Sequence, residues 1–209
     1  MRQKTRHSGR KRISRRQFLK QTAIGATTAA GLAAAPARAL AGSRLEPMAT
    51  LIDISRCVGC EECVYACRDA NADQFPEPVK PFPKMVPSRV PVADWSEKRD
   101  VMDRLTPYNW LYIQHASVSH KGKRHDLTIP RRCMHCLNPP CVKLCPWGAA
   151  KQEIGGHSRI DPDLCLGGAK CNKVCPWDIP QRQTGTGLYL NLLPRFAGNG
   201  VMYKCTRCY

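Results

Sequence analysis

Large aromatic side chains are scarce in this chain of 209 residues, at 7% of the total, which predicts a small hydrophobic core. A body of this size with so few of them needs cofactors or cross-links to hold it together. No apolar run reaches the roughly 18 to 20 residues of a membrane-spanning helix, so no such helix is predicted. The sequence also lacks a recognisable nucleophile–base pair, and we predict no catalytic residues and no bond chemistry by this chain alone.

Acidic residues are missing from the first part of the chain. The formal net charge is +17, but residues 1–41 hold ten Lys and Arg and no Asp or Glu, which leaves +7 for the remainder. A basic excess confined to one terminus is weak support for nucleic-acid binding, so we predict no nucleic-acid partner.

The same segment has the order of a secretory signal. Residues 14–20 read Ser-Arg-Arg-Gln-Phe-Leu-Lys, residues 22–35 are weakly apolar, and residues 37–39 form a small-residue cleavage site. The pair Arg15-Arg16 resembles the twin-arginine consensus. We expect residues 1–41 to be a signal peptide that directs the folded protein through the twin-arginine translocase to the periplasm, where association with the membrane through a partner is expected. A membrane anchor beyond Tyr209 does not follow from the sequence. The alternative is a disordered basic tail beside an Ala-rich helix.

Cysteine, by contrast, is abundant, with thirteen residues in four groups. The second and third groups are each followed by Pro and Trp, as Cys-Val-Lys-Leu-Cys-Pro-Trp-Gly and Cys-Asn-Lys-Val-Cys-Pro-Trp-Asp. This repetition predicts a duplicated module. The groups are Cys57, Cys60, Cys63 and Cys67; Cys133, Cys136, Cys141 and Cys145; Cys165, Cys171 and Cys175; and Cys205 and Cys208.

Three chemistries compete for these thiols. Cysteines two residues apart on a tight loop cannot easily pair as disulfides, and the total is odd. Zinc uses paired C-x2-C hooks and does not require a third Cys or a fourth followed by Pro. The spacing C-x2-C-x2-C-x3-C is typical of bacterial ferredoxins, in which three thiolates hold one cubane and the fourth reaches its neighbour. We therefore predict iron–sulfur clusters, keep zinc and disulfides as alternatives, and exclude c-type haem because no C-x2-C-H occurs.

The run from Cys133 to Pro146 resembles the second ferredoxin motif of the four-cluster electron-transfer subunits of the dimethyl sulfoxide reductase class. That class includes the iron–sulfur subunits associated with nitrite reductases, polysulfide reductases and hydrogenases. Residues 204–209, Lys-Cys-Thr-Arg-Cys-Tyr, resemble the opening of the family's fourth motif. The resemblance covers residues 48–67 and 127–209. It implies an α+β fold of duplicated bacterial ferredoxin-like modules with short strands, short helices and long cluster-binding loops.

The family pairs its first motif with the fourth and its second with the third, which implies up to four [4Fe–4S] sites. Only one set is complete in this chain, and a second has Gly168 where the family has its fourth cysteine. That site is expected to hold a [3Fe–4S] cluster or a cubane with an oxygen ligand, and an empty, degenerate loop is the alternative. The implied sets are Cys133, Cys136, Cys141 and Cys175; Cys145, Cys165 and Cys171; Cys57, Cys60 and Cys63; and Cys67, Cys205 and Cys208.

The ligand run breaks off within the fourth motif, so we interpret the sequence as C-terminally truncated, with a natural short protein as the alternative. A short strand is expected at residues 51–54, a hairpin from residues 110–114 and 126–129, and an irregular Pro-rich stretch at residues 76–91. The expected regions are 1–41, the signal peptide; 48–78, the first motif; 79–123, the Pro-rich insert and hairpin; 124–155, the second motif; 156–185, the third motif lacking one Cys; and 186–209, a connection and the start of the fourth motif.

Three residues beside the cysteines have competing interpretations. Trp147 and Trp177 follow the two Cys-Pro pairs, and we expect them to be core that keeps water from the clusters rather than parts of an electron path. His135 lies between two cysteines and is expected to be packed or solvent-facing, with tuning of a cluster potential through a hydrogen bond as the alternative.

The function that these expectations favour is that of an exported electron-transfer subunit. The resemblance implies that it relays electrons between a membrane quinone-reactive partner and a molybdopterin-type catalytic subunit, and is not an enzyme by itself. A zinc-stabilised binding module and a non-functional fragment of such a subunit are the alternatives. The terminal substrate and the direction of electron flow do not follow from the sequence.

Overall fold

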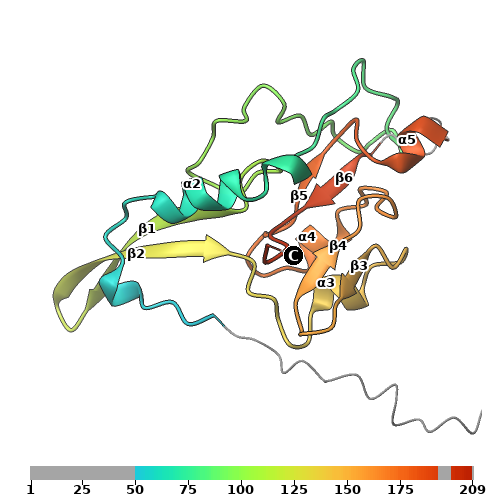
Figure 1. The fold of residues 1–209 in the computed structure, drawn as a ribbon. Helices are drawn as coiled ribbons and strands as arrows, with labels where there is room; N and C mark the ends of the chain where they lie inside the picture. Colours follow the sequence, from blue (N-terminus) through green and yellow to red (C-terminus); the bar gives the residue numbers. More distant parts are fainter. Residues whose placement is uncertain (1–49, 193–198, 209) are drawn as a thin grey trace, which may run out of the picture. The chain divides into compact units, whose positions relative to one another are not determined.

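The computed structural model describes residues 50–192 and 199–208, which all belong to one compact unit, Leu45–Tyr209. The expected signal peptide lies outside the described residues. Short helices alternate with three two-stranded antiparallel sheets, β1–β2, β3–β4 and β5–β6 (Figure 1). No described helix is long and apolar enough to cross a membrane. Few helices and small antiparallel sheets are compatible with small α+β ferredoxin-like modules.

Short helices and strands alternate along the chain, and the cysteine runs lie in or beside α2, α3 and α4 and after β6. In chain order they are the 3-10 turn η2 (Ile54–Arg56), α2 (Glu62–Asp69), the 3-10 turn η3 (Ala72–Gln74), β1 (Leu111–His120), β2 (Lys123–Arg132), α3 (Pro140–Lys143), β3 (Ala150–Gln152), β4 (Ser158–Ile160), α4 (Lys170–Lys173), β5 (Gln181–Gln183), α5 (Leu188–Leu192) and β6 (Val201–Tyr203).

The expected hairpin is confirmed and is longer than the sequence pattern indicates. β1 and β2 pair from Leu111 opposite Arg132 to His120 opposite Lys123. Both turn residues between them have positive φ, 49° and 74°, as a two-residue turn requires to match the twist of its strands. The region boundary expected between residues 123 and 124 lies next to this turn. β1 thus falls in the expected insert, and β2 after its first residue falls in the expected second motif region.

The helix α2 lies along β1 (Figure 1) and places the first cysteine run beside the hairpin. Val64, 1% exposed, is its buried residue. The ring of Phe75, which follows the helix, meets Tyr108 and Trp110 edge-on, at 5.8 Å between centroids in each pair. Arg68 donates to the carbonyl oxygen of Tyr108 at 3.0 Å. These contacts fix the end of α2 against the chain entering β1.

The strand expected at residues 51–54 is wrong. Ile54 begins the 3-10 turn η2, and Leu51 is 96% exposed. The Asp53 carboxylate accepts hydrogen bonds from the backbone and hydroxyl of Ser55, at 3.0 and 2.6 Å. An Asp side chain that bonds two residues ahead stabilises a turn in competition with an extended strand. Alternation of apolar residues alone therefore misled the prediction.

The Pro-rich stretch is irregular, as expected, and packs against the segment that contains β5. Val79 donates its backbone N–H to the carbonyl of Gly185 at 2.8 Å, and Thr184 donates to the carbonyl of Ala93 at 2.8 Å. The side chain of Gln183, fully buried, accepts from the backbone of Trp95 at 2.9 Å. These bonds satisfy backbone groups that proline-interrupted chain cannot pair with itself.

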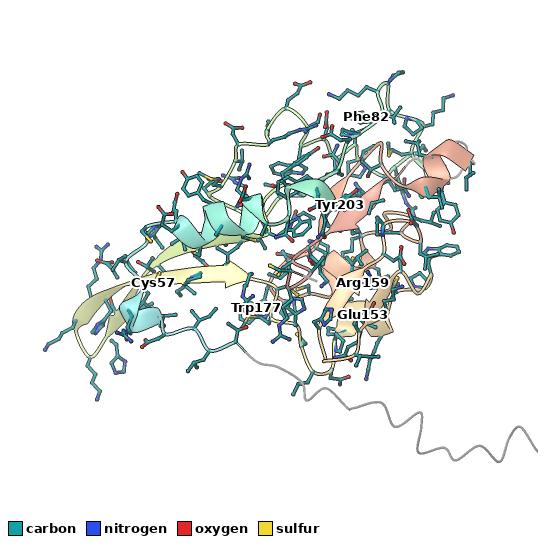
Figure 2. All side chains as sticks on the ribbon, viewed as in Figure 1. Cys57, Phe82, Glu153, Arg159, Trp177 and Tyr203 are labelled. Atoms are coloured by element: carbon teal, nitrogen blue, oxygen red, sulfur yellow. The ribbon has the colours of Figure 1, made fainter. Side chains whose placement is uncertain are left out.

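The repeat in the sequence corresponds to a repeat in structure. α3 and α4 each carry a cysteine, and each is followed by Cys-Pro-Trp and a short strand, β3 or β5. The turn between β3 and β4 is closed by an ion pair of Glu153 with Arg159 at 2.5 Å (Figure 2). The core between the repeats is small and contains sulfur: it consists of Ala149, Cys165, Cys171, Val201 and Met202.

Candidate iron–sulfur site

All thirteen cysteines are described and none forms a disulfide. Their exposure varies with their position in the four runs. Cys165, Cys171 and Cys205 are buried; Cys57, Cys67, Cys133, Cys141, Cys145 and Cys175 are half-buried; and Cys60, Cys63, Cys136 and Cys208 are exposed.

Each cysteine run contains at least one residue with left-handed backbone between its cysteines. Glu61, His135, Ala169 and Arg207 have φ of 61°, 46°, 54° and 69°, although none is glycine. Such residues cost energy in isolation, and they recur where a loop must curl so that successive N–H groups face inward. The four loops therefore share a conformation suited to an anionic group held in their concave side.

The second and third runs meet around Cys141. Burial raises the pKa of the Cys141 thiol; Lys204 opposes this, while the thiols of Cys133 and Cys175 add to it. These thiols thus lie within electrostatic reach of one another, although more than thirty residues separate Cys141 from Cys175. Cys136 belongs to the same loop as Cys133 and is exposed.

A second group of thiols surrounds Cys171. Burial, together with the thiols of Cys165, Cys141 and Cys145, raises the pKa of Cys171 to about 12. Gly168 lies in the loop between Cys165 and Cys171, and a Cβ atom placed there would meet nothing within 4 Å. The loop therefore has room for a side chain at the position where the thiol is missing.

The first run divides between two groups. Burial, together with the thiols of Cys205 and Cys208, raises the pKa of Cys67 to about 11, so the end of α2 lies beside the last run. Burial also raises the pKa of Cys63, with a contribution from Cys57 and Cys60. Neighbouring thiols from the implied sets influence one another, but Cys141 also acts on Cys171 and Cys63 on Cys67, across the boundaries of those sets. The assignment of each cysteine to a particular cluster stays a prediction.

The donor groups around these thiols fit an iron–sulfur cluster. Three backbone amides donate to sulfur at 3.4 to 3.5 Å, and hydrogen bonds to ligating sulfurs are a regular feature of such sites. Within residues 50–192 and 199–208, no three His, Cys, Asp or Glu side chains are close enough together to hold a single metal ion. The amide–sulfur pairs are Ala150 with Cys145, Met202 with Cys165, and Arg207 with Cys205.

Lys204 is a residue that the sequence did not mark as functional. Its side chain is buried, 3% exposed, and its ammonium contacts the Cys133 sulfur at 3.7 Å. It also donates to the carbonyl and hydroxyl oxygens of Ser158 and to the carbonyl of Cys205. The only signal in the sequence is its place before Cys205, which does not reveal the contact with a cysteine 71 residues away.

His135 is half-buried and packed, as expected, and it also has the hydrogen bond that was the alternative. Its Nδ1 accepts from the backbone N–H of Ser158 at 3.1 Å, so its ring proton is on Nε2, which lies 3.5 Å from the Cys205 sulfur. Burial, together with the positive charges of Lys204 and Arg207, lowers the pKa of His135 to about 3. The imidazole is therefore a neutral donor toward Cys205.

The expectation that Trp147 and Trp177 are core is wrong. They are 60% and 47% exposed. The guanidinium group of Arg131 stacks over the Trp177 ring at 5.0 Å, and Figure 2 shows this ring beside the end of β2. Each tryptophan follows proline in a surface turn, which turns the ring outward. The rings therefore cover the loops from outside instead of filling the interior.

Comparison with known protein families identifies the class of this protein. The chain matches the 4Fe-4S dicluster domain over residues 56–149 and a second 4Fe-4S dicluster domain over residues 125–209. The chain is thus an iron–sulfur protein with duplicated dicluster domains, and it carries [4Fe–4S] clusters. More narrowly, its two dicluster domains and its relatives match the class of ferredoxin-type electron-transfer subunits.

Its relatives include the hydrogenase-2 operon protein HybA of Escherichia coli O157:H7, 30% identical over 94% of this chain and 54% of the relative. One chain of the anaerobic dimethyl sulfoxide reductase of E. coli K12 is 30% identical over 76% of this chain and 60% of the relative. The formate dehydrogenase-O iron–sulfur subunit of E. coli K12 is 29% identical over 78% of this chain and 45% of the relative. The chain spans about half the length of the curated relatives it matches.

Proposed function

We propose that the chain is an exported electron-transfer subunit that relays single electrons between a membrane quinone or quinol partner and a molybdopterin-type catalytic subunit. The observation that carries the proposal is the presence of thirteen cysteines, none in a disulfide, within one compact unit that matches two 4Fe-4S dicluster domains. Several cluster sites in one small body give a path along which charge passes through an otherwise insulating polypeptide. The names of the relatives, a dimethyl sulfoxide reductase chain and a formate dehydrogenase iron–sulfur subunit, support the molybdopterin partner.

The thiol neighbourhoods define the cluster ligands that we propose. The set around Cys141 supplies four thiolates, and the other sets supply three each. The clusters would also contribute to stability, since a site that forms only in the folded chain couples metal binding to folding. The proposed sets are Cys133, Cys136, Cys141 and Cys175; Cys145, Cys165 and Cys171; Cys57, Cys60 and Cys63; and Cys67, Cys205 and Cys208.

For the set with Gly168 we propose a [3Fe–4S] cluster or a cubane with an oxygen ligand. Loss of one thiolate removes negative charge at the iron and raises the reduction potential. The Gly168→Cys variant tests this assignment, because the backbone there has room for a side chain. Electron paramagnetic resonance of the oxidised wild type should show a three-iron signal that the variant lacks; four irons at this site in the wild type would exclude the three-iron cluster.

Export rests on residues 1–41, which lie outside the described residues. We propose that the twin-arginine translocase carries the folded protein to the periplasm. Replacement of Arg15 and Arg16 by Lys should retain the protein in the cytoplasm with its clusters intact. Processed protein found outside the cytoplasm in this double variant would contradict the proposal.

We propose that a redox partner docks at a cavity of about 780 Å³ that Cys133 and Cys136 help to line. Its lining is mainly apolar and includes Met134, Leu137 and Trp177, all exposed. Among the described residues, arginines but no acidic residue line it, so a partner surface with carboxylates around an apolar centre would complement it. Electron transfer requires close approach, and Cys136 is exposed beside this surface.

The full chain, purified without air, provides the test of the whole proposal. We expect several irons and acid-labile sulfides per chain, a brown colour, and absorbance near roughly 400 nm that dithionite bleaches and a water-soluble quinone restores. Colourless protein that contains zinc would favour a binding module instead. Negligible iron and sulfide would overturn the electron-transfer assignment.

A further inference from the structure

A buried polar cluster joins two cysteine loops that are far apart in the sequence. Its members are Lys204 at the end of β6, Ser158 at the start of β4, and His135 in the second cysteine run. Ser158 is 1% exposed and Lys204 is 3% exposed. The cluster lies between Cys133 of the second run and Cys205 of the last run, and it contacts the sulfur atoms of both.

Lys204 presents a charge problem that the described residues do not solve. The seven ion pairs found among the described residues do not include it, so no described carboxylate lies within 4.0 Å of its ammonium. Its contacts are two carbonyls, one hydroxyl and the Cys133 sulfur. A buried cation is unstable unless a negative charge compensates it. Thiolate ligands and the cluster they hold carry net negative charge, and the contact with Cys133 places that charge beside the ammonium.

His135 completes a reciprocal arrangement. It belongs to the same loop as Cys133, yet its Nε2 proton faces the sulfur of Cys205 at 3.5 Å. Lys204 immediately precedes Cys205, yet it donates to the sulfur of Cys133. Ser158 orients both donors, because its backbone N–H bonds His135 Nδ1 and its oxygens accept from Lys204. Each loop thus supplies a hydrogen-bond donor to a cysteine of the other loop.

We propose that Lys204 and His135 are positioning residues that form a bridge between two cluster sites, each raising the reduction potential of the cluster held by the other loop. The inference rests on the proposed function, because it concerns the clusters that the two loops bind. Reduction adds negative charge to a cluster, and a hydrogen bond or a positive charge at its sulfur ligands stabilises that reduced state. The bridge therefore links the potentials of neighbouring clusters to one small set of side chains.

The Lys204→Gln variant of the full chain tests the larger contribution. Its clusters are titrated by electron paramagnetic resonance, and the signal of the Cys133 site is identified by its loss in Cys141→Ser. We expect the equilibrium constant for reduction of that cluster to fall about tenfold, equivalent to about 59 mV for one electron, while the Gly168 site stays unchanged. Lys204→Arg, which keeps the charge, should restore most of the potential.

The matched control is Lys173→Gln, which removes a positive charge from within another cysteine run but at an exposed position. Solvent screens that charge, so the potentials should not move. His135→Asn tests the other half of the bridge: Asn tolerates the left-handed backbone at this position, but is too short to reach the sulfur. It should lower the potential of the cluster next to Cys205.

The outcomes separate this inference from the proposed function. Wild-type protein without iron–sulfur clusters would overturn both. Clusters present with potentials unchanged in Lys204→Gln and His135→Asn would overturn the bridge alone. Loss of iron in Lys204→Gln that Lys204→Arg restores would support the bridge. If both Lys204 variants lose iron, an unchanged potential in His135→Asn overturns the bridge and a lowered one supports it.

Discussion

Two regions of this molecule hold thiols in different surroundings. The central region contains the second and third cysteine runs, where six of seven cysteines are buried or half-buried and two of them, Cys165 and Cys171, belong to the hydrophobic core. The outer region contains the first and last runs, where three of six cysteines are exposed. In the central region each run packs against its repeat. In the outer region α2 meets the last run through Cys67, while Cys57 and Cys60 lie in the loop before that helix and Cys63 lies in its first turn.

The difference teaches that the second and third runs contribute cysteines to the small core, together with Val201 and Met202 of β6, whereas the first run contributes none. Burial of Cys165 and Cys171 makes these thiols, which we propose as cluster ligands, part of the hydrophobic core. The first loop lies against the hairpin. A Cβ atom placed at Gly59 would be 3.5 Å from the side chain of His115 in β1 and 3.2 Å from that of Thr128 in β2. Substitutions in the two regions should therefore differ in their effect on stability.

The largest difference between the two regions, in iron content and in unfolding free energy, is expected between Cys171→Ala and Cys60→Ala. Cys171→Ala removes a buried sulfur and a cluster ligand together, so we expect loss of iron at that site and about 2 kcal/mol or more of unfolding free energy. Cys60→Ala should remove iron from the first loop only and change the unfolding free energy of the central region by about 0.5 kcal/mol or less. Iron analysis with anaerobic urea unfolding measures both, and equal destabilisation by the two variants would contradict the distinction.

A smaller effect is expected from a matched pair of glycines within the central region. Gly167 has φ of 63°, and a Cβ there would lie 2.5 Å from the carbonyl oxygen of Asn199. Gly168, its neighbour, has room for a Cβ. Gly167→Ala should thus cost about 2 kcal/mol of unfolding free energy, while Gly168→Ala should change it by about 0.5 kcal/mol or less. Urea unfolding midpoints compare the two, and a greater loss in Gly168→Ala would refute the steric explanation.

The smallest effect concerns the two tryptophans at the surface of the central region. Trp177→Leu removes the stacking of Arg131 and should destabilise the protein by about 0.5 to 1 kcal/mol. Trp147→Leu, at a more exposed ring for which the described structure has no cation stacked within this distance, should cost less. Thermal unfolding of the iron-loaded variants measures the difference. Destabilisation by several kcal/mol in either variant would contradict the surface position and indicate that the tryptophan is part of the core.

The sequence predicted those features that depend on neighbours in the chain. The hairpin followed from two apolar segments around a Lys-Gly turn, and the irregular insert from the density of proline between residues 76 and 91. The strand at residues 51–54 failed because the Asp53 side chain, a local competitor, stabilised a turn. The core position of Trp147 and Trp177 failed because periodicity and spacing do not tell on which side of a loop a ring lies.

Cysteine spacing in the sequence predicted the cofactor class of this protein. A cubane needs thiolates a few residues apart on a curled loop, and this spacing can be seen within a short segment of sequence. The tertiary structure decided how the loops meet. It brought Lys204 to Cys133 and His135 to Cys205 across about seventy residues of chain, with Ser158 between them. Such contacts arise only when the loops pack and exclude water. Burial then strengthens the electrostatic effect of the Lys204 ammonium and of the His135 ring proton on the neighbouring sulfur atoms.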